Sequence, residues 1–170
     1  SLRYMKADFV DFLRNFKLQR KYVTVKPSLV RPDSVDIIVK GPWVQTILFE
    51  IYILAIINQI HYEDLDKEEL YVEGRKRLQQ KIEVIKSHPN NKKLSFSDFG
   101  TRRRFNGEWH FEVVKTLKEA LPESFTGTSN VWMAKELGLT PIGTMAHEYL
   151  QACQVLGPTL RYFQKFAFEA

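Results

Sequence analysis

Three stretches of the sequence share one form: LSFSDFG at 94–100, SFTGTSN at 124–130 and IGTMAHE at 142–148. In each, a short apolar or β-branched run leads into polar residues, and these runs predict strands over 94–99, 125–128 and 142–145. Apolar residues at helical spacing predict helices over 108–120 and 131–137, and another helix from about residue 146. Strands and helices that alternate at this spacing predict an α/β fold with parallel strands.

Before residue 92 the predicted strands and helices do not alternate in this way. Helical spacing of phenylalanines predicts a helix over 5–16, and β-branched runs predict strands at 22–25 and 35–39. An apolar helix is expected from Pro42 to about Tyr62, and a charged helix over 65–87. The first of these is hydrophobic almost all round, so we expect it to be buried.

Length and composition restrict the class of protein. The 170 residues suit one domain or slightly more, and the 44% hydrophobic content excludes a disordered chain. A single cysteine, Cys153, excludes an internal disulfide framework and favours a reducing compartment. No signal peptide is apparent, and the most apolar run, 47–60, contains Glu50 and is shorter than the roughly 20 residues that a bilayer needs.

Both ends of the chain look cut. The sequence starts at Ser1 without a methionine, and residues 160–170 have the pattern of a helix that is still running at the last position. We therefore expect this chain to be a piece of a longer protein.

Basic residues concentrate in one segment. The net charge is +5, and residues 92–104 hold five bases against one acid, Asp98. A guanidinium matches the geometry of phosphate oxygens, so Arg102, Arg103 or Arg104 is a candidate anion ligand. The alternative is a solvated run. Cations at a helix start oppose its dipole unless an anion or an acidic partner lies nearby, which favours a functional role for at least one arginine.

The polar stretches should converge, because the carboxyl ends of parallel strands share one edge of a sheet and active sites form there. Ser129 lies in the second stretch, where capping of the next helix is the alternative interpretation. Thr144 could cap the last helix and place His147 in its first turn, as a general base, a nucleophile or a structural residue. No second His or Cys stands at ligand spacing from His147, so no metal site is expected. The remaining histidines are interpreted as structural; they are His61, His88 and His110.

The combined motifs closely resemble the nicotinate phosphoribosyltransferase family of bacterial type. They are SDFGTRRRF at 97–105, GTSN at 127–130, GTMAHE at 143–148, KADF at 6–9 and GPW at 41–43, with the helix through Glu50. The resemblance covers essentially the whole chain, and family members are more than twice as long. It implies the end of an N-terminal α+β sandwich-like domain at 1–42, connecting helices at 43–91, and the first strand–helix units of an irregular parallel α/β barrel at 92–170.

The resemblance implies an enzyme of NAD salvage that forms nicotinate mononucleotide and pyrophosphate from nicotinate and phosphoribosyl pyrophosphate. ATP hydrolysis through a phosphohistidine drives the reaction, with Mg²⁺ bound mainly through substrate phosphates. His147 matches the phosphorylated histidine, Thr144 a position near nicotinate, Phe99 the ring that stacks on the pyridine, and Arg102 a phosphate contact. Related enzymes that use nicotinamide carry an acid in place of Ser129, and a carboxylate there would repel the nicotinate anion.

The resemblance further implies a cytoplasmic homodimer with a shared active site, without a nucleic-acid or membrane partner. An aromatic residue from the neighbouring subunit, a further arginine and the main phosphoribosyl contacts would come from outside this chain, so the piece alone is expected to be inactive. Two alternatives remain: an enzyme of the same fold that uses nicotinamide or quinolinate, and a phosphate- or RNA-binding module that uses Lys92, Lys93 and the arginines.

Overall fold

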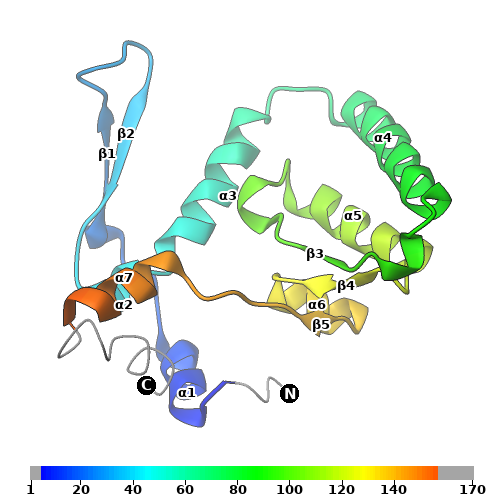
Figure 1. The fold of residues 1–170 in the computed structure, drawn as a ribbon. Coiled ribbons are helices and arrows are strands. Elements are labelled where there is room, and N and C mark those ends of the chain that lie inside the picture. The colour runs from blue at the N-terminus through cyan, green and yellow to red at the C-terminus, as the bar shows by residue number, and fades with distance from the viewer. Residues whose placement is uncertain (1–4, 157–170) are drawn as a thin grey trace. The chain divides into compact units, whose positions relative to one another are not determined.

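The computed structural model describes residues 5–156 and forms two compact units, which are treated separately below (Figure 1). The first unit contains the described residues up to Lys67 together with Thr101–Gly107. The second contains Glu68–Gly100 and the described residues from Glu108 onward. The helix expected at 160–170 lies outside the described residues. The division of the chain into 1–42, 43–91 and 92–170, which the family resemblance implies, is based on the domains of the family and not on contacts within this chain. It stays a prediction.

The first unit is built on a hairpin and an apolar helical segment. Strands β1 (Val23–Pro27) and β2 (Val35–Val39) pair antiparallel in the register Val23↔Val39. The connecting loop contains Asp33 in the left-handed region at φ 60°. The helices of this unit are α1 (Ala7–Asn15), η1 (Arg20–Tyr22), α2 (Trp43–Thr46), α3 (Phe49–His61) and η3 (Thr101–Arg103). The two strands, α1 and the apolar helical segment were predicted, although the apolar helix is divided after Thr46; the short helices η1 and η3 were not predicted.

Helix α3 is not the buried helix that its composition predicts. Only Phe49 and Ala55 are buried, whereas Tyr52, Ile56 and Ile60 are each more than half exposed. In the first unit α3 packs against the short η3, which is too small to cover every side of a 13-residue helix. Among the described residues, Trp43–His61 has 19 residues and an apolar composition that would allow a membrane span. The sequence estimate was therefore wrong on length, although core helices of soluble proteins meet the same criterion.

The second unit contains a parallel sheet covered by helices. Its strands are β3 (Phe96–Asp98), β4 (Phe125–Thr128) and β5 (Thr140–Pro141), in the order β3-β4-β5, with both pairs parallel. Its helices are α4 (Lys67–Ser87), η2 (Asn91–Lys93), α5 (Gly107–Ala120), α6 (Val131–Leu137) and α7 (His147–Leu156). The mixed α/β class and the parallel pairing agree with the prediction from the alternating pattern.

The core of this unit is apolar and draws on four elements. Ile82 of α4 and Val114 of α5 are fully buried, and Phe125 of β4 and Met133 of α6 pack with them. Burying a Val, Ile, Phe or Met side chain stabilises a fold by roughly 1.5–3 kcal/mol. The core therefore fixes α5 and α6 against the sheet, whose strand ends carry the polar stretches.

Strand β5 lies earlier than the sequence predicts. The expected strand at 142–145 is replaced by Thr140–Pro141, which pairs with Gly127 and Thr128. The reason is a close approach: a Cβ at Gly127 would lie 2.0 Å from the Thr140 carbonyl oxygen. Glycine at this position admits the neighbouring backbone, and the ladder ends where Ile142 N donates to Thr128 O at 2.9 Å.

Candidate functional site

The ends of β3 and β4 are joined by backbone hydrogen bonds. Asp98 pairs with Thr128 in the parallel register, and Ser129 N donates to Asp98 O at 2.8 Å. Phe99 and Ser129 each follow the last residue of one of these strands. The structure therefore brings together the first two polar stretches, which the sequence placed 30 residues apart.

The side chains of these two residues remain accessible to a ligand. Phe99 is 47% exposed despite its apolar ring, and Ser129 is half-buried. The helix cap at this turn is Asn130, whose Oδ1 accepts from Met133 N at 3.1 Å. The stretch at 127–130 therefore does cap α6, as the alternative interpretation expected, but the capping residue is Asn130 and not Ser129.

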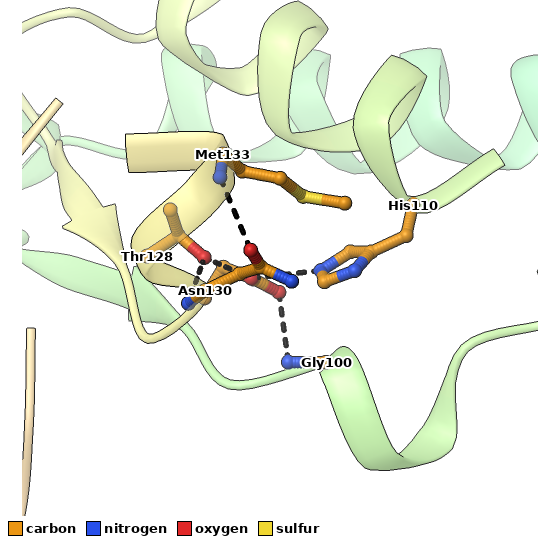
Figure 2. A network of polar contacts seen from close by, with 6 residues as sticks. Gly100, His110, Thr128, Asn130 and Met133 are labelled. Atoms are coloured by element: carbon orange, nitrogen blue, oxygen red, sulfur yellow. Dashed lines mark hydrogen bonds and ion pairs between the residues drawn. The ribbon is translucent and has the colours of Figure 1, made fainter. Parts of the chain in front are cut away.

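A buried polar network lies between the two strand ends. Asp98 Oδ2 accepts from Thr128 Oγ1 at 2.6 Å and contacts His110 Nε2 at 2.8 Å, while Asp98 Oδ1 accepts from Gly100 N at 2.9 Å. Figure 2 shows His110 of α5, Thr128 of β4 and the amide of Gly100 around the same carboxylate, that of Asp98. Thr128 is fully buried, and the Asp98 and His110 side chains are only 12% and 4% exposed.

The network keeps Asp98 ionised. Burial by itself raises the pKa of Asp98, but hydrogen bonds from His110 and Thr128, the charge interaction with His110 and the Gly100 amide outweigh it. The pKa of Asp98 therefore lies below 3.8, the ordinary value for this side chain. An ionised carboxylate only accepts hydrogen bonds, so His110 and Thr128 both donate to it.

The sequence interpretation of His110 as a structural histidine agrees with this buried position, but its partner was not predicted. Asp98 lies 12 residues away, and His110 belongs to no local motif. Its apolar neighbours Trp109 and Phe111 gave no indication of a buried polar partner. Only the packing of α5 against the sheet brings the pair together.

Arg102 lies in the first unit and already has an acidic partner. Its guanidinium forms an ion pair with Glu50 of α3, and its carbonyl accepts from Asn58 Nδ2 at 2.8 Å. The sequence argument required an anion or an acidic partner for the arginine run, and Glu50 is such a partner. Both side chains are about half exposed, so the pair is open to competition from an anion.

The third polar stretch leads into α7. The helix begins at His147, in agreement with the predicted first-turn position, and the Ala146 carbonyl accepts from Leu150 N at 3.3 Å. Ala146 therefore takes the cap position that the sequence offered to Thr144. Thr144 and His147 are exposed, and within residues 5–156 neither side chain makes a hydrogen bond or ion pair.

These features define an α/β protein with polar loops at the carboxyl ends of parallel strands. The family model described as the nicotinate phosphoribosyltransferase (NAPRTase) family matches residues 94–170, and its N-terminal domain model matches residues 1–58. The nicotinate phosphoribosyltransferase of Burkholderia ambifaria is 49% identical over 99% of this chain, and that of Xanthomonas campestris is 48% identical over 100%. The chain belongs to the nicotinate phosphoribosyltransferase family.

Solved structures agree with this assignment. The nicotinate phosphoribosyltransferase of Vibrio cholerae has a TM-score of 0.83 at 30% identity over 98% of this chain and 40% of its own. The structure from Porphyromonas gingivalis has a TM-score of 0.79 at 29% identity over 99% of this chain and 41% of its own. The chain spans 42% of the length of the Burkholderia and Xanthomonas relatives.

Proposed function

We propose that the full-length protein carrying this chain is an ATP-dependent nicotinate phosphoribosyltransferase of NAD salvage. The pyridine nitrogen of nicotinate attacks C1 of phosphoribosyl pyrophosphate, the bond from C1 to the pyrophosphate oxygen breaks, and nicotinate mononucleotide and pyrophosphate form. The observation that carries this proposal is the juxtaposition of Phe99 and Ser129 at paired strand ends, within a chain of this family.

The two strand-end residues suit an anionic aromatic ring. The exposed ring of Phe99 offers a stacking face, and the Ser129 hydroxyl offers a neutral hydrogen-bonding group. Thr144 lies in the loop after β5 and is assigned to the same ligand. Asp98, the acid nearest in sequence to Phe99, has three hydrogen-bond donors on its carboxylate, which reduces its repulsion of nicotinate.

His147 is the proposed site of phosphorylation. It is exposed at the first turn of a ten-residue helix, where the backbone amides of a helix start and the helix dipole stabilise a phosphoryl group. A ring nitrogen of His147 takes the γ-phosphoryl group of ATP with release of ADP, and water later cleaves the phosphoramidate. Arg102 contacts substrate phosphate by exchanging its ion pair with Glu50 for a phosphate oxygen.

Magnesium is assigned to the substrates rather than to a protein site. Among the described residues, no group of three His, Cys, Asp or Glu side chains could hold a metal ion. Phosphate oxygens of ATP and phosphoribosyl pyrophosphate supply the ligands that Mg²⁺ prefers. We further propose a cytoplasmic homodimer with a shared active site, an N-terminal sandwich-like domain and an irregular α/β barrel completed by the remaining chain.

The test is turnover by the full-length protein. Nicotinate, phosphoribosyl pyrophosphate, ATP and Mg²⁺ should yield nicotinate mononucleotide, ADP and pyrophosphate, separated by chromatography. Parallel reactions with nicotinamide and quinolinate distinguish the two related substrates. Efficient turnover of either, without turnover of nicotinate, would refute the proposal.

A further inference from the structure

Asp98, His110 and Thr128 make and break no bond in the reaction proposed above. Their hydrogen-bond network nevertheless holds two turns closed. Asp98 Oδ1 accepts from Gly100 N at 2.9 Å, and Thr128 Oγ1 accepts from Asn130 N at 3.0 Å. Each is a side-chain turn that bonds to the backbone two residues further on.

The middle residue of each turn is a proposed nicotinate-binding residue. Phe99 lies between Asp98 and Gly100, and Ser129 lies between Thr128 and Asn130. The Thr128 hydroxyl donates to Asp98 Oδ2, so the two turns are also bonded to each other. The Asp98 carboxylate therefore joins the two turns through side chains, in addition to the backbone bond from Ser129 N to Asp98 O.

His110 fixes that carboxylate from a third element. Its Nε2 lies 2.8 Å from Asp98 Oδ2, and its ring, carried by α5, is only 4% exposed. The space is tight, because a Cβ at Gly100 would lie 2.8 Å from Asp98 Oδ1 and 3.1 Å from His110 Nε2. Without the imidazole, the carboxylate would lose a charge-assisted bond and gain room to rotate.

We propose that His110 is a positioning residue for nicotinate: by holding Asp98, it fixes the two turns that present Phe99 and Ser129. This inference rests on the proposed function for its ligand. His110 touches neither the substrate nor the reacting atoms in this assignment, so its removal acts on binding of the pyridine rather than on the chemical step.

The experiment compares two substitutions in the full-length enzyme. His110→Leu removes the donor and should raise KM for nicotinate about tenfold, the lower end for losing a hydrogen bond to a charged group. The value of kcat and the KM for phosphoribosyl pyrophosphate should change less than about twofold on the same reasoning. His110→Gln can still donate to Asp98, and it should recover most of the affinity.

Val114→Ala is the matched control, because it lies on the same helix, is fully buried and belongs to the apolar core. It should lower stability while leaving KM for nicotinate unchanged. The inference is overturned if folded His110→Leu keeps the wild-type KM, if His110→Gln fails to restore it, or if Val114→Ala raises it equally. A fall in kcat alone would also overturn it.

Two further measurements cover the remaining outcomes. If His110→Leu does not fold, Thr128→Val removes another donor to Asp98 and should raise KM for nicotinate in the same direction; an unchanged KM overturns the inference. If the wild-type enzyme does not use nicotinate, the proposed function fails, and hydrogen exchange at the Ser129 amide decides the positioning role. Exchange of this amide, which donates to Asp98 O, should be faster in the His110→Leu protein, and equal rates would refute the role.

Discussion

The strand ends of β3 and β4 and the segment that leads into α7 carry the same kinds of residue but are built differently. At the first place, His110 and Thr128 are buried, the Asp98 side chain is only 12% exposed, and their hydrogen bonds fix the turns around them. At the second, Thr144 and His147 are exposed. We infer that the proposed pyridine-binding part of the site is preorganised, whereas the proposed phosphoryl-transfer part offers a helix terminus to a phosphate.

The largest effect is expected from replacing His147, which should abolish phosphate labelling of the protein. In the full-length protein, γ-labelled ATP should transfer its phosphate to a group that is labile in acid and stable in base, as a phosphoramidate is. His147→Ala should abolish the label, because no other nitrogen at the start of α7 can replace the imidazole. His61→Ala, at an exposed histidine that ends α3, is the control and should label normally. A labelled His147→Ala protein would remove the phosphohistidine from the proposal.

Arg102 is neither part of the strand-end network nor exposed without a partner, because it forms an ion pair with Glu50. Arg102→Ala should weaken binding of phosphoribosyl pyrophosphate about 10- to 100-fold, the effect of losing a charge-assisted contact of about 1.5–3 kcal/mol. Arg102→Lys should restore part of the affinity, since lysine keeps the charge but not the planar fork. Isothermal titration measures both.

The neighbouring Arg103 provides the control for that titration, because it is exposed and lies on the same short helix. Arg103→Ala should leave the affinity unchanged. If Arg103→Ala loses affinity and Arg102→Ala does not, the phosphate contact belongs to Arg103.

Sequence predicted best the elements whose boundaries are set locally. Strand β4 and helix α6 were predicted at their observed bounds, because Asn130 caps one end of α6 and Gly138, in the left-handed conformation at φ 60°, ends the other. The parallel sheet and the approach of the first two polar stretches at paired strand ends followed from the strand–helix alternation.

What sequence did not predict depends on neighbours distant in the chain. The position of β5 is set by the contact of Gly127 with the Thr140 backbone. The exposure of α3 depends on which elements pack against it, and its composition could not show this. The Asp98–His110 pair requires α5 to pack on the sheet before the two side chains meet.

A smaller effect is expected at Ser129, within the preorganised region. Ser129→Asp places a carboxylate beside the nicotinate carboxylate, and two like charges ~4 Å apart repel by about 4 kcal/mol at an effective dielectric of ~20. Partial exposure and proton uptake reduce this, so kcat/KM for nicotinate should fall at least about tenfold, equivalent to about 1.4 kcal/mol. The ratio of kcat/KM for nicotinate to that for nicotinamide should move toward nicotinamide without a full switch.

Ser95→Asp is the control for added charge, since Ser95 is exposed and precedes β3, at the opposite end of the strand. It should leave the substrate ratio unchanged. An unchanged ratio in Ser129→Asp would mean that this hydroxyl does not face the substituent of the pyridine ring.

The smallest expected effect concerns acid stability and tests whether the strand-end network is ionised. The pKa of Asp98 is lower in the folded protein than the ordinary value of 3.8, so the folded state binds its proton less readily than the unfolded state. The contribution of Asp98 to the free energy of unfolding is therefore present above about pH 4 and is lost as the pH falls through the folded pKa. Asp98→Asn removes this titration, so its urea midpoint should fall less steeply below pH 4 than that of the wild type.

Glu112→Gln provides the comparison, because the exposed Arg75–Glu112 pair also lowers the pKa of its acid but is screened by solvent. If the urea midpoints of Asp98→Asn and wild type fall equally steeply below pH 4, Asp98 is not held ionised by His110 and Thr128. The inference that the strand ends of β3 and β4 are preorganised would then fail.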